Sequence, residues 1–193
     1  YGEEVSSVVE RRTNPSGGHR FESDTTSLSF CRERRNGGME KTVYIHYGAS
    51  VFDSAKGFPI KNRPHWNKPV GGLWASREAA TFGWRDWCEG EEPDWIELSK
   101  FFRFTLRDGA KVGVIHSIPD LCRLPTVDDD LFWWSSEMLD FEECLRQGWD
   151  AIELCWYGEE YKDQRGTDNM YYGLYGWDCD CILILNPDVV VQI

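Results

Sequence analysis

The chain has 193 residues, 41% of them hydrophobic and 15% aromatic with ten tryptophans, so it can bury a substantial core and is not globally disordered. Its formal net charge of −12 argues against a broad phosphate-binding surface, because non-specific affinity for nucleic acids comes mainly from lysine and arginine. No apolar run approaches membrane-spanning length, so we expect no membrane partner. The length predicts one domain, or one domain with an appendage.

The seven cysteines are an odd number at irregular spacing, and none belongs to a Cys-x-x-Cys pair of the kind typical of zinc and dithiol sites. The acidic run from Asp128 to Asp130 is not a metal site either, since adjacent carboxylates alone define no coordination geometry. We expect no metal, and reduced thiols in a reducing compartment such as the cytosol, that of a host or target cell included. The cysteines are Cys31, Cys88, Cys122, Cys144, Cys155, Cys179 and Cys181.

The first 40 residues are polar and carry turn formers and arginine clusters. This composition predicts a loosely held N-terminal extension over residues 1–40, followed by a folded domain over residues 41–193. No specific residue in the extension favours a partner-binding or regulatory role.

The first predicted elements of the folded domain surround a proline-rich connection. β-branched and aromatic residues predict a strand over Thr42–Tyr47. Prolines, Gly57 and Asn62 predict an irregular loop over Phe52–Pro69. A short strand follows over Gly71–Ser76, and Ser76 is placed to cap a helix running over residues 77–87.

The second half of the chain is dominated by predicted strands. The strongest hairpin pattern joins strands over Phe101–Leu106 and Lys111–Ile115 through the turn pair Asp108-Gly109. Helical periodicity over Leu139–Trp149 ends at Gly148. Further strands are expected over residues 151–155, 181–185 and 189–193. Together these strands and helices predict an α+β fold with mainly antiparallel strands and few short helices.

Three short motifs follow one another along these strands. His46 and Gly48 close the first strand, Leu73-Trp74-Ala75-Ser76 forms the second, and Glu153 lies within a later one. In this order they resemble the ADP-ribosyltransferase superfamily, in the branch of diphtheria toxin and the poly-ADP-ribose polymerases. The resemblance covers roughly residues 41–193 and implies a split β-sheet with NAD as co-substrate.

The resemblance implies a role for each matching residue. His46, the backbone of Tyr47 and Gly48 would hold NAD, Trp74 would stack on the nicotinamide ring, and Ser76 would fix the local geometry. A second stacking aromatic would come from Phe82 or Trp84, between which the sequence does not choose. Trp74 stands where the family carries tyrosine, but cation–π attraction does not require a hydroxyl. Tyr47 stands where relatives often have glycine.

Glu153 would be the catalytic residue. Breaking the bond between nicotinamide and ribose builds positive charge on the sugar, and a carboxylate beneath the ribose stabilises that charge most in the transition state. Ala151 occupies the position two residues earlier, where the arginine-modifying branch carries a second acid. The resemblance therefore disfavours chemistry that needs two acids.

The function that this resemblance implies is a mono-ADP-ribosyltransferase of the toxin or effector type. The acceptor would be a macromolecule, and the net negative charge of the chain favours a protein over a nucleic acid. A cognate inhibitor protein is a further expected partner. The loop before Glu153, with Phe132-Trp133-Trp134, and the connection over residues 157–176 are candidates for acceptor recognition.

The sequence leaves several alternative functions open. Water as acceptor would give an NAD glycohydrolase, and the same fold could serve as a non-catalytic binding module. A cysteine nucleophile would pair Cys155 with His116 or His46, although no local motif supports that pairing. Taken singly, the histidine and tryptophans are also explained as core residues, and Ser76 as a helix cap.

Overall fold

The computed structural model describes residues 41–94, 96–128, 137–166 and 174–193. The predicted extension over residues 1–40, most of the acidic run at 128–130 and the aromatic group at 132–134 lie outside the described residues. In the part of the chain that is described, no helix has both the length and the apolar character needed to cross a membrane.

The described elements alternate strands with short helices. The strands are β1 (Tyr44–Tyr47), β2 (Lys61–Arg63), β3 (Trp66–Val70), β4 (Leu73–Arg77), β5 (Phe101–Leu106), β6 (Val112–Ile115), β7 (Thr126–Asp128), β8 (Glu137–Leu139), β9 (Ala151–Leu154), β10 (Cys181–Ile184) and β11 (Val190–Gln192). The helices are α1 (Trp84–Glu91), α2 (Ile118–Leu121) and α3 (Phe141–Arg146), with short 3₁₀ helices η1 (Glu159–Tyr161) and η2 (Pro187–Val189).

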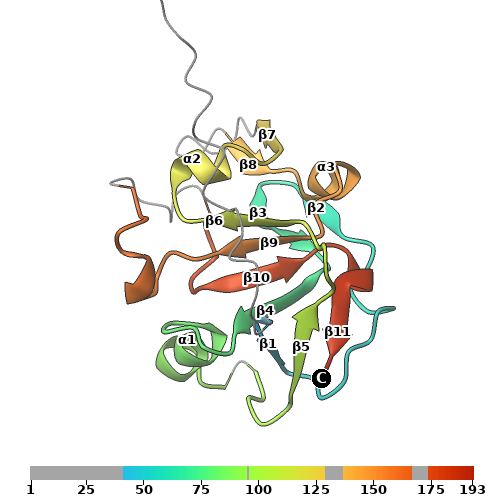
Figure 1. Cartoon of the computed structure of the whole chain (residues 1–193), viewed down its shortest axis with the longest axis vertical. Coiled ribbons are helices and arrows are strands. Elements are labelled where there is room, and N and C mark those ends of the chain that lie inside the picture. The colour runs from blue at the N-terminus through green and yellow to red at the C-terminus, as the bar shows by residue number, and fades with distance from the viewer. Residues whose placement is uncertain (1–40, 95, 129–136, 167–173) are drawn as a thin grey trace, which may run out of the picture. The chain divides into compact units, whose positions relative to one another are not determined.

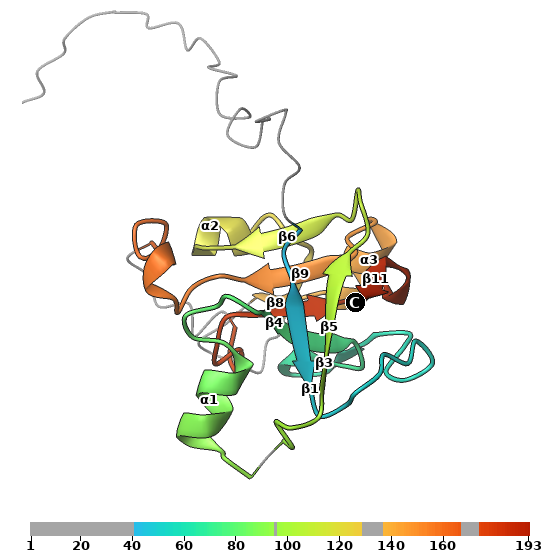
Figure 2. The same ribbon diagram turned by 60° about the horizontal axis from the view of Figure 1, so that its bottom comes forward.

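Seven of the described strands form the central sheet in the order β11-β5-β1-β4-β10-β9-β6, and all neighbours are antiparallel except β6 and β9. The predicted α+β class with a mainly antiparallel sheet is therefore confirmed. The sheet has two halves whose strands run crosswise to one another, β11-β5-β1 and β4-β10-β9-β6 (Figure 1). Figure 2 shows β1 and β5 passing in front of β9 and β10.

Alternation along the strands gives the second half of the sheet two distinct apolar faces. Ile182 and Ile184 of β10 face one way and pack with Tyr44, Phe102 and Phe104 of the first half. Residues on the opposite face pack against α2, α3 and the loop before β10. This face carries Ile152, Leu154 and Leu183, and the residues that pack against it include Leu121 of α2, Phe141 of α3 and Trp177 of the loop.

The predicted hairpin between Phe101–Leu106 and Lys111–Ile115 is wrong. Both strands form as β5 and β6, but β5 pairs with β1 and β11, whereas β6 pairs with β9 and in parallel. The Asp108-Gly109 turn carries the chain from one half of the sheet to the other, with Gly109 at a φ of +81°. Burial of both strands in separate cores outweighs the local turn preference.

Two further predictions around β4 are corrected. The helix expected over residues 77–87 begins only at Trp84, because Arg77 still belongs to β4 and pairs with Tyr44 of β1. The irregular loop expected over Phe52–Pro69 contains the hairpin β2–β3, in which Asn67 is buried and accepts a hydrogen bond from the backbone of Leu139. Tertiary contacts to β8 and α3 make this proline-rich segment regular.

Candidate functional site

His46 lies where the two halves of the sheet separate. β1 pairs with β5 over all four of its residues but with β4 only through Tyr44 and Ile45. Beyond that point the His46 ring bridges the gap, with Nδ1 2.7 Å from the carbonyl oxygen of Trp74. Because a carbonyl can only accept, Nδ1 carries the hydrogen, and the Nε2 atom of the neutral ring is left as an acceptor. Burial lowers the pKa of His46, which favours this neutral form.

A pocket of about 390 Å³ opens beside this bridge, between β1, β3, β4 and α1. His46, Tyr47, Trp74 and Trp84 line it, so the structure brings together four of the residues expected to hold NAD. The two indoles are not parallel: their centroids lie 6.4 Å apart at an interplanar angle of 80°. The site is therefore a corner between two indoles set nearly at right angles, not a pair of parallel rings that could both stack on one ligand ring.

Lys68 places a positive charge in this corner. Its Nζ lies 5.9 Å from the ring centroids of both Trp74 and Trp84, within cation–π range. Asp178 is the only carboxylate with which it forms a salt bridge among the described residues, at a long 3.9 Å. Arg63 also lines the pocket, with its guanidinium over Trp66. Neither cation was predicted as part of the site, because both lie in the segment expected to be irregular.

A second, larger pocket of about 610 Å³ shares Tyr47 and Trp84 with the first. Three arginines line it, and the two on β4 and β5 already form salt bridges, Arg77 with Glu153 and Arg103 with Glu78. The third, Arg85 of α1, pairs with Glu89. These shared walls place a polar compartment, the larger pocket, beside the aromatic one.

Gly48 ends β1 and turns the chain away from the site. Its φ is +96°, and its amide donates to the Lys100 carbonyl at 2.7 Å. A β-carbon at this position would lie 3.3 Å from Ile96, another residue lining the smaller pocket. Gly48 is therefore needed for the turn and for the pocket wall.

Ser76 and Phe82 connect the site to its surroundings rather than lining the smaller pocket. The Ser76 hydroxyl donates to the Asp180 carbonyl at 2.7 Å and accepts from the Trp84 amide at 2.9 Å, so it caps α1 from a neighbouring strand. Phe82 packs on Tyr157, with 5.8 Å between ring centroids. The residue that accompanies Trp74 in the pocket is therefore Trp84.

Glu153 is held away from the aromatic corner. It shares a face of the sheet with Ala75, because Ile182 of β10 pairs with both, and Trp74 consequently points to the opposite face. Its side chain is 4% exposed and receives two charged hydrogen bonds from Arg77, at 2.6 Å from Nε and 2.7 Å from Nη2. Arg77 follows the second motif directly, but its role was not predicted.

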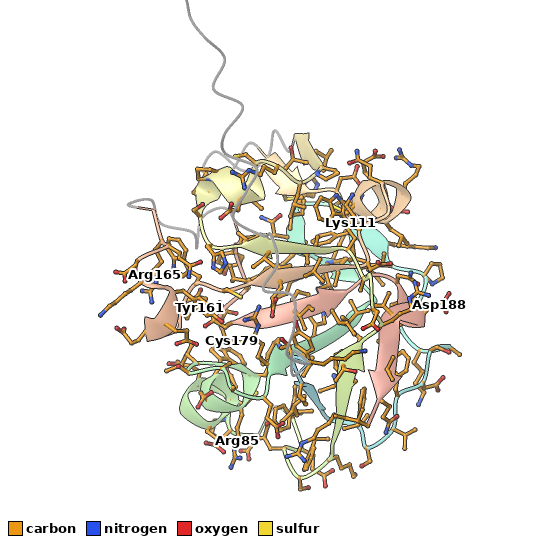
Figure 3. All side chains as sticks on the ribbon, in the orientation of Figure 1. Arg85, Lys111, Tyr161, Arg165, Cys179 and Asp188 are labelled. Carbon is orange, nitrogen blue, oxygen red and sulfur yellow. The ribbon has the colours of Figure 1, made fainter. Side chains whose placement is uncertain are left out.

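Cys155 is not activated as a nucleophile. Burial raises the pKa of its thiol to about 12, with the Glu153 carboxylate as a further cause. His116 bonds the Cys155 carbonyl oxygen at 3.1 Å, and its ring packs 5.4 Å from Tyr161, marked in Figure 3 on η1. A thiol with so high a pKa is almost entirely protonated at neutral pH, which speaks against the cysteine-nucleophile alternative.

Asp180 is the most densely bonded buried acid in the described structure. Its carboxylate accepts from the backbone amides of Trp156, Tyr157 and Gly158 at 2.6, 2.8 and 2.7 Å. Burial raises its pKa, and these three donors oppose that effect. Asp180 thus fixes the turn after β9, while its backbone carbonyl holds Ser76. In the sequence, the one sign of this role is that Asp180 lies between Cys179 and Cys181, directly before an apolar strand.

The buried His46 predicts a pH dependence of stability. Its pKa is lowered in the folded state, so its contribution to stability is present above about pH 6.5 and is lost as the pH falls through the folded-state value. We expect wild type to lose more unfolding free energy than His46→Gln between about pH 7.5 and about pH 5.5, since glutamine can still donate to the Trp74 carbonyl but does not titrate. Urea unfolding at the two pH values measures this difference, and equal losses would contradict it.

The described residues contain no group of three or more histidine, cysteine or acidic side chains arranged to hold a metal ion. Comparisons of the chain with protein-family models, curated proteins and solved structures found no match.

Proposed function

We propose that this domain binds NAD in the cleft between β1, β4 and α1, as an ADP-ribosyltransferase-like fold, and transfers its ADP-ribose to a macromolecular acceptor. The observation that carries the proposal is the convergence of two motifs distant in sequence. His46 and Trp74 share a direct hydrogen bond, and both line the same aromatic pocket. The separation of the sheet at this bond is the feature expected of a split-sheet nucleotide cleft.

The chemistry of the smaller pocket suits one end of a dinucleotide. The indole face of Trp74 offers a stacking surface for a planar ring, and neutral His46 offers Nε2 to a ligand hydroxyl or amide donor. Lys68 and Arg63 would repel a cationic ring by itself, but they suit the diphosphate that accompanies nicotinamide in NAD. The polar compartment beside the pocket leaves room for the remaining nucleoside.

A second candidate is a non-catalytic NAD-binding module, and the position of Glu153 favours it. Stabilising a cationic ribose requires a carboxylate next to the sugar, whereas Glu153 faces away from Trp74 and is neutralised by Arg77. Transfer by the first proposal would need Glu153 to part from Arg77 and reach the cleft, or another acid to act in its place. Binding and turnover are therefore tested separately.

Binding is tested by calorimetric titration of the full chain with NAD. We expect Trp74→Leu to weaken binding by about tenfold, because aromatic stacking on a bound base contributes roughly 1–3 kcal/mol. Trp149→Leu is the matched control, since this indole packs beside Lys111 far from the cleft. An equal effect of both substitutions, or no binding by wild type at millimolar NAD, would contradict the proposed ligand.

Turnover is tested by measuring nicotinamide released from NAD, with and without candidate acceptor proteins. Release that Glu153→Gln lowers by orders of magnitude, in a variant that still binds NAD, would support the transferase. Binding without release would identify the non-catalytic module. Release that persists in Glu153→Gln would remove this residue from the mechanism.

A further inference from the structure

A third hollow lies beside α1, with lining residues that differ from those of the two pockets near His46. This open groove, of about 480 Å³, is formed by α1 and by the segments around Phe82, Tyr157 and Asp178. Three aromatic and three acidic side chains line it: Phe82, Trp87, Tyr157, Glu91, Glu92 and Asp178. The resemblance expected Phe82 to stack on NAD, and Tyr157 begins the connection expected to recognise the acceptor, but none of the six residues lines either pocket of the proposed NAD site.

The aromatic side chains of the groove are held in place by contacts within the domain. The Phe82 and Tyr157 rings lie 5.8 Å apart, and the Trp87 ring packs edge-on against Trp84 at 5.7 Å. The Tyr157 hydroxyl donates to the Trp177 carbonyl at 2.9 Å, which joins the two segments that flank the groove. These rings are therefore arranged before any ligand arrives, and binding costs little side-chain entropy.

The acidic side chains of the groove have few positive partners. Glu91 and Glu92 form no salt bridge with any residue the structure describes, and Asp178 has only its long contact with Lys68. Trp87 and Glu91 are four residues apart on α1, so the indole and the carboxylate lie on one face of the helix. The groove thus combines aromatic surfaces with two carboxylates, Glu91 and Glu92, that no salt bridge to a described residue compensates.

We propose that this groove binds an arginine side chain presented by a basic segment of a partner protein. A guanidinium is attracted to aromatic faces and can also donate hydrogen bonds to carboxylates along its edge, so it satisfies both halves of the groove at once. Lysine offers a more strongly hydrated point charge without the planar stacking surface. An open groove admits a side chain from a polypeptide, and the net charge of −12 steers basic partners toward the domain.

The test uses the full chain and a fluorescently labelled hexapeptide of alternating glycine and arginine, with lysine and citrulline versions beside it. Fluorescence anisotropy at low ionic strength measures the dissociation constants. We expect the arginine peptide to bind at least about tenfold more tightly than the citrulline peptide, which keeps the planar shape but lacks the charge, and several-fold more tightly than the lysine peptide.

Two double variants with the same change in net charge separate the groove from the general acidity of the chain. Glu91→Gln with Glu92→Gln should weaken arginine-peptide binding by about tenfold, whereas Glu142→Gln with Asp188→Asn should change it less than about twofold. The control residues are exposed on α3 and on η2, where Figure 3 marks Asp188. Trp87→Leu, checked for folding by circular dichroism, should weaken binding further.

Equal weakening by both double variants would overturn the proposal in favour of non-specific charge attraction. Equal affinity for the citrulline and arginine peptides would overturn it as well. The two glutamate substitutions leave the residues that line the NAD pockets unchanged, and NAD binding is measured separately, so failure of this proposal is distinguishable from failure of the proposed function. Trp87 contacts Trp84 of the smaller pocket, so NAD binding is measured for Trp87→Leu as well.

Discussion

Asp180→Asn is expected to lower the free energy of unfolding by about 2–4 kcal/mol, because it removes a buried charge that satisfies three backbone donors. Asparagine retains one accepting oxygen, but its NH₂ group is a donor. It would face backbone N–H groups that also donate and cannot bond to it. At least one of the Trp156, Tyr157 and Gly158 amides would then be buried without an acceptor. The turn after β9 would loosen, and with it the contact that Asp180 makes to Ser76.

Urea unfolding followed by circular dichroism measures this loss, and Asp178→Asn is the matched control. Asp178 lies two residues away and is half-buried, and its only salt bridge to a described residue is the 3.9 Å contact with Lys68. We therefore expect the control to change stability by no more than about 0.5–1 kcal/mol. Similar losses in the two variants would show that the three backbone bonds contribute little.

The sequence patterns that predicted secondary structure correctly belong mainly to segments whose side chains are buried. The run over Cys181–Leu185 and the alternating Phe101–Leu106 form strands where expected, and Gly148 ends α3 with a φ of +80°. Pairing partners were not predictable in this way. The Asp108-Gly109 turn looks the same whether it closes a hairpin or carries the chain to another half of the sheet, and only the packing of the two cores decides.

The motifs predicted which residues line the smaller pocket better than they predicted the partners of those residues. His46 and Trp74 were chosen from separate strands, and the structure joins them through one hydrogen bond. Their polar partners were not predictable, because Lys68, Arg77 and Asp180 acquire their roles through contacts between distant segments. The face to which Glu153 points depends on the register of β10 with β4 and β9, which periodicity along one strand does not reveal.

A double-mutant cycle between Arg77 and Glu153 is expected to show strong coupling. Arg77→Met would leave the Glu153 carboxylate buried without its partner, and we expect a loss of roughly 3–4 kcal/mol in unfolding free energy. Glu153→Gln should cost less, because Arg77 is about one-third exposed and can turn toward water. Its expected loss is about 1–2 kcal/mol.

The double variant is the informative one. Arg77→Met with Glu153→Gln removes both charges, so its loss should be smaller than the sum of the single losses by about 1–3 kcal/mol. The pKa of Tyr44 is raised, first by burial and then by the nearby Glu153 carboxylate, so this tyrosine stays protonated. Its hydroxyl can donate a hydrogen bond to glutamine at position 153 as well as to glutamate. Additive losses would mean that the two side chains are not coupled in solution. Glu153 would then be free of Arg77, which is the condition that the transferase proposal requires and the non-catalytic proposal does not.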